Sequence, residues 1–252
     1  MSATRRQWLA AISVGGAGLI LSGCANGNKA QSGEQPGGKS SAGDEDRKGG
    51  EVTATEDLMR EHGILRRALL VYQGVVPKLR SHPPSVAPDA LQRTAKLFRA
   101  FGEDYHEKKL EEAYIFPAVK QAGGAAAALP DVLTAQYQRG REITDYIIAV
   151  TNGGKLGAGN ADALAKALES FVLMYGNHAA REDTIIFPAW KQTLTAKQLD
   201  EMGEKFEEIE EQQFGGDGYE DAVRQIGDIE GSLGLADISQ FTAPPPPKVA
   251  GS

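Results

Sequence analysis

The chain has 252 residues and a formal net charge of −7, from 34 acidic and 27 basic residues. Such a balance offers no basic patch of the kind that nucleic-acid binding requires, so we exclude DNA and RNA as partners. The single cysteine, Cys24, excludes an internal disulfide and a metal site built from thiolates. Any bound metal must therefore be held by His, Asp, Glu or Tyr.

The amino terminus has the pattern of a bacterial export signal. The pair Arg5-Arg6 precedes an apolar run from Leu9 to Leu21, which is shorter than the roughly 20 apolar residues that cross a bilayer. Leu21-Ser22-Gly23-Cys24 closes this run and resembles a lipobox. We expect a twin-arginine (Tat) signal peptide over residues 1–23 and lipidation of Cys24. The mature lipoprotein would then be exported to the periplasm, or another extracytoplasmic space, and lipid-anchored to the membrane.

Residues 24–51 are rich in small and charged residues and show no apolar periodicity. Such a segment cannot bury enough apolar surface to offset its conformational entropy. We expect it to be a disordered linker between the lipid anchor and a folded domain.

From Thr53 onward, apolar residues recur at steps of three and four, which predicts an all-α fold. A first helix opens with the capping-box spacing of Thr53 and Glu56 and ends at His82-Pro83-Pro84. Its inner face is predicted to carry Leu58, His62, Leu65, Leu69 and Tyr72.

Three more long helices are expected, over about 88–121, 130–151 and 161–191, with Gly-rich or short connections between them. The inner stripe of the last one is Leu164, Leu168, Phe171, Tyr175, His178, Glu182 and Ile185. Together these elements predict an up-and-down antiparallel four-helix bundle over residues 52–192. Within residues 193–252 we expect two extra C-terminal helices, Leu199 to Phe214 and Tyr219 to Leu233, and a Pro-rich tail, all packed on the bundle.

The second and fourth helices carry the same pattern twice. Tyr105-His106, Glu111-Glu112 and Ile115-Phe116-Pro117-Ala118 return as Tyr175, His178, Glu182-Asp183 and Ile186-Phe187-Pro188-Ala189. A histidine followed about one turn later by a carboxylate places a nitrogen and an oxygen on nearly the same helix face. Each copy therefore has the pattern of half a metal site.

Three of the four histidines, His62, His106 and His178, fall on three different bundle helices, whereas His82 lies in a proline-rich loop and is expected at the surface. Several ionisable groups in one apolar core are costly unless a cation pairs with them. We expect a pair of metal ions. The alternative interpretations are hydrogen-bonded structural histidines and a solvated acidic helix face.

The segment from about residue 55 to 191 resembles a hemerythrin-like domain of the HHE cation-binding type. The matching motifs are Glu61-His62, Tyr105-His106 with Glu111 through Pro117, and Met174-Tyr175 with His178 through Pro188. The resemblance implies a non-haem di-iron site, or another divalent metal, that binds dioxygen or related small molecules. It implies that His62, His106 and His178 are terminal ligands and that Glu111 and Glu182 are bridging ligands.

Two departures from the family pattern matter. The step from histidine to carboxylate is five residues in the second helix and four in the fourth, which differ by about 100° on an ideal helix. We therefore predict a π-bulge between His106 and Glu111. If the helix there were regular, Asp183 would replace Glu182 as the metal ligand.

The second departure is Tyr137, which stands where the family usually has a histidine. Either Tyr137 ligates ferric iron as a phenolate, or the site has lost a ligand and gained an open position. A third interpretation is that Tyr137 only fills space beside Leu133 and Ile148. With three histidines, the chain is a poor match to simple reversible oxygenation.

Our leading hypothesis is an exported, lipid-anchored di-iron protein that binds or senses dioxygen, nitric oxide or peroxide, or that holds iron. A di-iron oxidase or peroxidase is the second hypothesis, favoured by Glu103-x-x-His106. It is weakened because Met59 and Tyr175 stand three residues before His62 and His178. The third is a structural module whose metal site is degraded at Tyr137. No catalytic residue and no protein partner is assigned.

Overall fold

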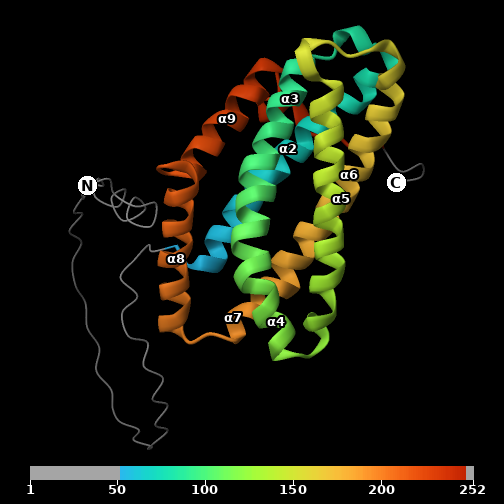
Figure 1. Ribbon diagram of the computed structural model, residues 1–252. Coiled ribbons are helices and arrows are strands. Elements are labelled where there is room, and N and C mark those ends of the chain that lie inside the picture. Colours follow the sequence, from blue (N-terminus) through green and yellow to red (C-terminus); the bar gives the residue numbers. More distant parts are fainter. Residues whose placement is uncertain (1–51, 248–252) are drawn as a thin grey trace, which may run out of the picture. The chain divides into compact units, whose positions relative to one another are not determined.

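The computed structural model describes residues 52–247, and every regular element in that range is helical. The all-α expectation is therefore confirmed. Figure 1 shows long rods running side by side, each formed by one helix or by consecutive helical segments. In chain order the bundle elements are α2 (Ala54–Ser81), α3 (Pro88–Leu97), the π-helix η2 (Phe98–Ile115), α4 (Phe116–Ala122), α5 (Leu129–Val150), α6 (Ala161–Arg181), the π-helical segment η6 (Glu182–Ile186) and α7 (Phe187–Gln192).

The predicted helix starts and stops have identifiable local causes. Thr53 accepts a hydrogen bond from the backbone N–H of Glu56, and the Glu56 carboxylate accepts one from the backbone N–H of Thr53, which completes the predicted capping box. The rod that starts at α3 ends at Gly123, whose φ of 76° favours glycine because it has no side chain. Local sequence thus sets the length of the rods.

Each rod of the bundle contacts two neighbours around a shared core. Helix α2 contacts α6 and η2, and α5 contacts η2 and α6 on the other side. Phe98, Phe171 and Tyr175 fill one layer of this core, with ring centroids 4.6 to 4.9 Å apart. Full burial of such a side chain stabilises the fold by about 1.5–3 kcal/mol, so this layer holds the η2 and α6 rods together.

Two stretches of π-helix end at the isoleucine that begins each copy of the repeated Ile-Phe-Pro motif. The backbone N–H of Phe116 donates to the carbonyl of Glu111, and that of Phe187 donates to the carbonyl of Glu182, five residues earlier in both cases. The proline that follows has no N–H and its ring crowds the carbonyl four residues before it, so a wider turn accommodates it. The π-bulge predicted between His106 and Glu111 is confirmed as part of the longer π-helix η2.

The second π-helical segment was not predicted, and it changes which isoleucine is buried. The sequence pattern predicts Ile185 on the inner stripe of the fourth helix, but Ile185 is 40% exposed, whereas Ile186 is fully buried. The prediction was wrong because it assumed 3.6 residues per turn up to the proline. A wider turn from Glu182 to Ile186 rotates the following residues by roughly one position.

The C-terminal helices α8 (Ala196–Phe214) and α9 (Gly218–Ser232) pack along the α2 and α3–η2 side of the bundle, as Figure 1 shows. Phe214 of α8 lies against Phe101 and Tyr105 of the π-helix, with ring centroids 6.1 and 5.3 Å away. Helix α8 therefore covers the outer side of η2, the segment that carries His106 and Glu111.

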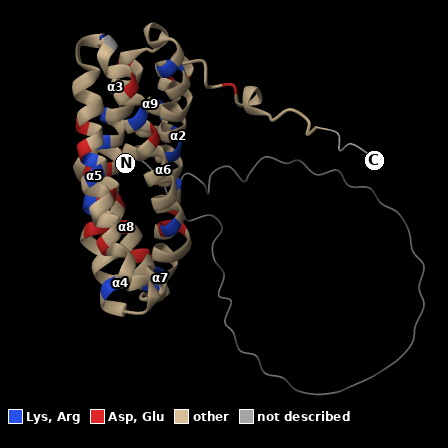
Figure 2. Ribbon diagram, turned by 90° about the vertical axis from the view of Figure 1, so that its right-hand side faces the viewer, with Lys and Arg blue, Asp and Glu red and all other residues tan. Residues whose placement is uncertain are grey.

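Acidic and basic residues are interspersed along the helices, as Figure 2 shows. After α9, the described tail leads away from the bundle and contains the short 3₁₀ turn η7 (Ile238–Phe241). The expectation that this tail packs on the bundle is therefore wrong: Ile238 and Phe241 are 81% and 62% exposed. Over residues 52–247, no helix combines the length and apolar character needed to cross a membrane. The signal peptide, linker and lipidated Cys24 expected for residues 1–51 lie outside the described range.

Candidate metal centre

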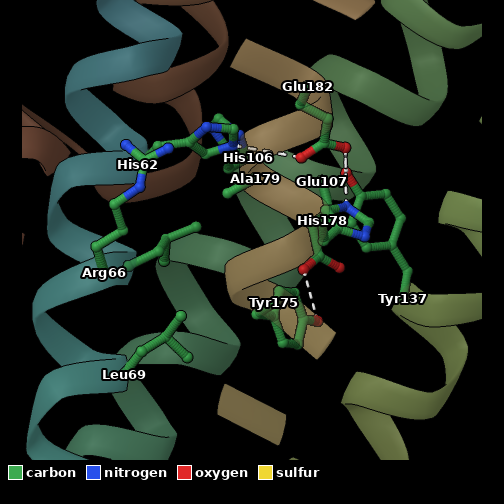
Figure 3. Close-up of a pocket in the computed structure, with 11 residues that line it drawn as sticks. His62, Arg66, Leu69, His106, Glu107, Tyr137, Tyr175, His178, Ala179 and Glu182 are labelled. Carbon is green, nitrogen blue, oxygen red and sulfur yellow. Dashed lines mark hydrogen bonds and ion pairs between the residues drawn. The ribbon is translucent and has the colours of Figure 1, made fainter. Parts of the chain in front are cut away.

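Three histidines from three rods meet in the middle of the bundle with two glutamates. His62 on α2 and His106 on η2 have ring centroids 4.7 Å apart, and His178 approaches from α6. Glu111 and Glu182 lie between them, and Figure 3 shows the three imidazoles and Glu182 around one small volume. All five side chains are buried, with at most 3% of their surface exposed. His82, by contrast, is exposed in the loop after α2.

The five side chains form two overlapping groups whose donor atoms lie within 4.8 Å of one another. One group consists of His62, His106 and Glu111, and the other of Glu111, His178 and Glu182. Glu111 belongs to both groups. This arrangement could hold two metal ions joined by a shared carboxylate.

A second side chain orients each of the three imidazoles through its Nδ1 atom. The acceptor oxygens lie 2.6 to 2.8 Å from Nδ1 and come from Asp183 for His62, Glu61 for His106 and Gln136 for His178. An acceptor at Nδ1 keeps the proton there and leaves the lone pair of Nε2 free to bind a cation. The three Nε2 atoms face the glutamates, so the imidazoles are in the orientation that a metal site requires.

Several atoms that face this centre are buried and make no hydrogen bond. They are Nε2 of His106, Nε2 of His178, Oε1 of Glu111 and Oε2 of Glu182. Leaving one such atom unsatisfied costs about 1–3 kcal/mol, more for a charged group. Imidazole nitrogens and carboxylate oxygens are ligands for divalent iron and similar cations. A pair of cations fits this donor set because it would satisfy all four atoms at once.

Without a cation, the electrostatics of these donors are unfavourable. Burial, and then the neighbouring carboxylate of Glu182, raise the pKa of Glu111 to about 8. Burial also lowers the pKa of His62, despite its hydrogen bond to Asp183. Burial opposes charge on His106 as well, but the carboxylates of Glu111 and Glu61 raise its pKa well above the ordinary value. Bound cations would remove the repulsion between the two glutamates.

Tyr137 of α5 lies inside the centre. Its hydroxyl donates to Oε1 of Glu182 at 2.8 Å and also contacts Oε2 of Glu111. Its ring stacks on Phe116 and lies 4.6 Å from the ring of His178. A role limited to filling space beside Leu133 and Ile148 is therefore incomplete, because the hydroxyl bridges two candidate metal ligands.

Asp183 lies next to the centre and belongs to neither donor group. Its carboxylate accepts hydrogen bonds from Nδ1 of His62 and from the guanidinium of Arg66. Although burial opposes it, these two donors lower the pKa of Asp183. The structure thus brings Glu182 to the centre, and Asp183 positions His62.

Several residues that shape the centre were not assigned a role from the sequence. They are Glu61, Arg66, Glu107, Gln136, Arg141 and Tyr175. One signal was available: Glu103, Glu107 and Glu111 are spaced by four, which puts three glutamates on one helix face beside buried apolar residues. The partners on other helices had no such signal, because sequence spacing does not report contacts across a bundle.

Comparisons with known proteins agree with this geometry. The Hemerythrin HHE cation binding domain matches residues 53–190. Uncharacterized proteins of Mycobacterium bovis and Mycobacterium tuberculosis are 44% identical to the chain over 192 residues, which is 76% of this chain and 74% of each relative. No solved structure matches the chain. The chain therefore belongs to the hemerythrin HHE cation-binding family.

Proposed function

We propose that the protein is a non-haem di-iron protein that binds or senses dioxygen, nitric oxide or peroxide, or that holds iron. The observation that carries this proposal is the convergence of buried nitrogen and oxygen donors that make no hydrogen bond. His62, His106 and His178 would be the terminal ligands, and Glu111 and Glu182 would bridge. When bound, two irons would supply redox chemistry and an open position for a small ligand.

The protein's own contribution is orientation and exclusion of water. Glu61, Gln136 and Asp183 hold the imidazoles with Nε2 toward the centre, and the surrounding helices keep all five ligands out of solvent. The hydroxyl of Tyr137 contacts one carboxylate oxygen of each glutamate and so holds the two carboxylates next to each other. If ferric iron were bound, the oxygen of Tyr137 would be a further candidate ligand, because it lies against both glutamates.

Iron analysis of the purified full chain tests this proposal. After anaerobic loading with ferrous iron and removal of excess metal, we expect about two irons per chain and near-ultraviolet absorption once the protein is exposed to air. His178→Ala should lose most of this iron. His82→Ala is the matched control, because it removes the exposed histidine and should load like the wild type. A wild-type chain that retains no iron would refute the proposal.

The alternative that a specific observation favours is a structural module without metal. The hydroxyl of Tyr137 already bridges Glu111 and Glu182, as a polar side chain would in a core where hydrogen bonds have replaced a metal. For such a module, stability would be the same with and without a chelator. A metal-binding protein must instead lose stability when its metal is removed, since the ion binds only the folded state.

We further propose that the protein is exported and lipid-anchored through Cys24. The support is the order of paired arginines, apolar run and lipobox in the sequence. Cys24→Ala should move the protein from the membrane fraction to the soluble fraction in the native host. Ser41→Ala, a change of similar size in the predicted linker, should not. A Cys24→Ala protein that stays with the membrane would contradict the anchor.

A further inference from the structure

The exposed apolar side chains gather on two neighbouring rods and in the tail after α9. Within residues 52–247, seven large hydrophobic side chains are exposed, and Val132 on α5 is one of them. The other six lie on α2, on the rod formed by α6 and η6, or in the tail, and they are Met59, Leu70, Leu173, Ile185, Ile238 and Phe241. A group of such side chains on one part of a protein surface is typical of an interaction site.

Leu70 and Leu173 lie on the outer side of the seam between α2 and α6. The two rods are in contact and antiparallel, since two ion pairs join them, Arg66 with Asp183 and Arg80 with Glu169. In the chain, Leu70 lies between the two arginines and Leu173 between the two acids, so both occupy the stretch of seam that the ion pairs bracket. Their side chains are 59% and 69% exposed, and a Cβ atom at nearby Gly176 would meet no neighbouring atom. We call Leu70 and Leu173 the seam patch.

The tail presents a second apolar pair. Ile238 and Phe241 lie three residues apart on the 3₁₀ turn η7, where side chains at this spacing stand one above the other. The side-chain amide of Gln240 ties the turn together, because it donates to the carbonyls of Gly234 at 2.9 Å and of Asp237 at 2.7 Å. Both apolar side chains are exposed, and the tail leads away from the bundle (Figure 2). The turn therefore offers its apolar pair to a surface other than that of its own bundle.

A second copy of the chain supplies the matching surface. The side chain of Leu235 lies beside Gly74 of α2, one helical turn after Leu70, so the tail leaves the bundle close to the seam patch. Two copies related by a two-fold axis can therefore exchange tails, because each copy brings one turn and one patch. The two reciprocal contacts would cover on the order of 1,000 Å² of apolar surface, which is near the lower limit for a specific interface.

We propose that the protein forms a two-fold dimer in which η7 of each copy docks on the seam patch of the other copy. Ile238 and Phe241 are the anchors, and Leu70 and Leu173 receive them. Removal of apolar surface from water drives the association. The hydrogen bonds of Gln240 lower its entropic cost, because the turn is already ordered before it binds. No metal takes part, so this inference is independent of the proposed di-iron function.

Sedimentation equilibrium of the purified, metal-free full chain tests this dimer. Phe241→Ser removes an anchor of the tail, and Leu173→Ser removes half of the seam patch. Val132→Ser is the matched control, because Val132 is also exposed, at 53%, but lies on α5, outside the patch and the tail. Ile238→Ser and Leu70→Ser provide a second variant of each surface, and circular dichroism checks that every variant keeps its helices.

We expect the wild type to be a dimer with a Kd in the micromolar range, since its interface is small. Each dimer contains a substitution twice, so Phe241→Ser and Leu173→Ser should each raise the Kd at least about 100-fold. Val132→Ser should leave the Kd within about threefold of the wild type.

An equimolar mixture of Phe241→Ser and Leu173→Ser chains gives the sharper test. The mixed dimer keeps one intact contact, from the unchanged tail of the Leu173→Ser chain to the unchanged patch of the Phe241→Ser chain. Its Kd should therefore be about tenfold lower than that of either variant alone. A contact between two tails or between two patches would give no such recovery.

Four results would overturn the dimer. The wild type could be a monomer, or its Kd could be the same in all tail and patch variants, which would put the interface elsewhere. Variants of only one of the two surfaces could weaken association, or the mixture could bind no more tightly than either variant, and in both cases tail and patch do not contact each other. Iron content plays no part in these measurements, so failure of the di-iron function would leave the dimer standing.

Discussion

Replacing Tyr137 by Phe tests how the two central glutamates are held. The change removes one hydroxyl and keeps the ring between Phe116 and His178. The lost hydrogen bonds go to buried carboxylates, which are worth about 1.5–3 kcal/mol each in such surroundings. Because one phenol has a single proton to share, we expect the metal-free protein to lose about 2–3 kcal/mol of unfolding free energy. For a chain of this size, that loss lowers Tm by roughly 4–12 °C.

The assay is thermal unfolding followed by circular dichroism, with excess chelator and with iron. Tyr72→Phe is the matched control, because that hydroxyl is also buried but makes no hydrogen bond, so its loss should cost less than the loss of the Tyr137 hydroxyl. Equal stability of the two variants in chelator would refute our account of the centre. With iron bound, the cations would pair with both carboxylates, so the difference in unfolding free energy between Tyr137→Phe and the wild type should shrink. A deficit that persists, with loss of a visible absorption band, would identify Tyr137 as a ferric ligand.

Two further variants test the surroundings of the centre. The two carboxylate oxygens of Glu61 lie 2.6 Å from His106 Nδ1 and 3.1 Å from the Tyr105 hydroxyl, and Glu61→Gln leaves only one of these oxygens as an acceptor. Metal affinity, measured by competition with a chelator, should therefore fall about 10–100-fold. Unchanged affinity would contradict the orienting role of Glu61. Glu103→Gln tests pH dependence: burial raises the pKa of Glu103 to about 7, so the folded state holds this proton more tightly than the unfolded state. Protonation of Glu103 therefore stabilises the folded state fully below about pH 4.5. This stabilisation, at most about 3 kcal/mol, is lost as the pH rises through 7. Urea unfolding of the metal-free protein should show a shallower decline from pH 5 to 8 in Glu103→Gln than in the wild type, and parallel curves would count against a buried, protonated Glu103.

The sequence alone determined the helical class and much of the chemistry. Steps of three and four, the Thr53 capping box and the glycine and proline breaks are local features, and local hydrogen bonding is enough to realise them. The five-residue step from His106 to Glu111 predicted the π-bulge, because both residues had to face one core. The repeated motif also predicted that imidazoles and carboxylates would converge.

The tertiary structure decided what surrounds each of these groups. The π turn before Pro188 placed Ile186 inside in place of Ile185, which spacing alone could not show. Contacts from Asp183 to His62 and from Tyr137 to Glu111 join different rods. The period of one helix shows which of its faces is buried, but not how far each rod is rotated or shifted against its neighbours. Those two quantities depend on side-chain packing throughout the core, and they determine which polar atoms meet at the centre.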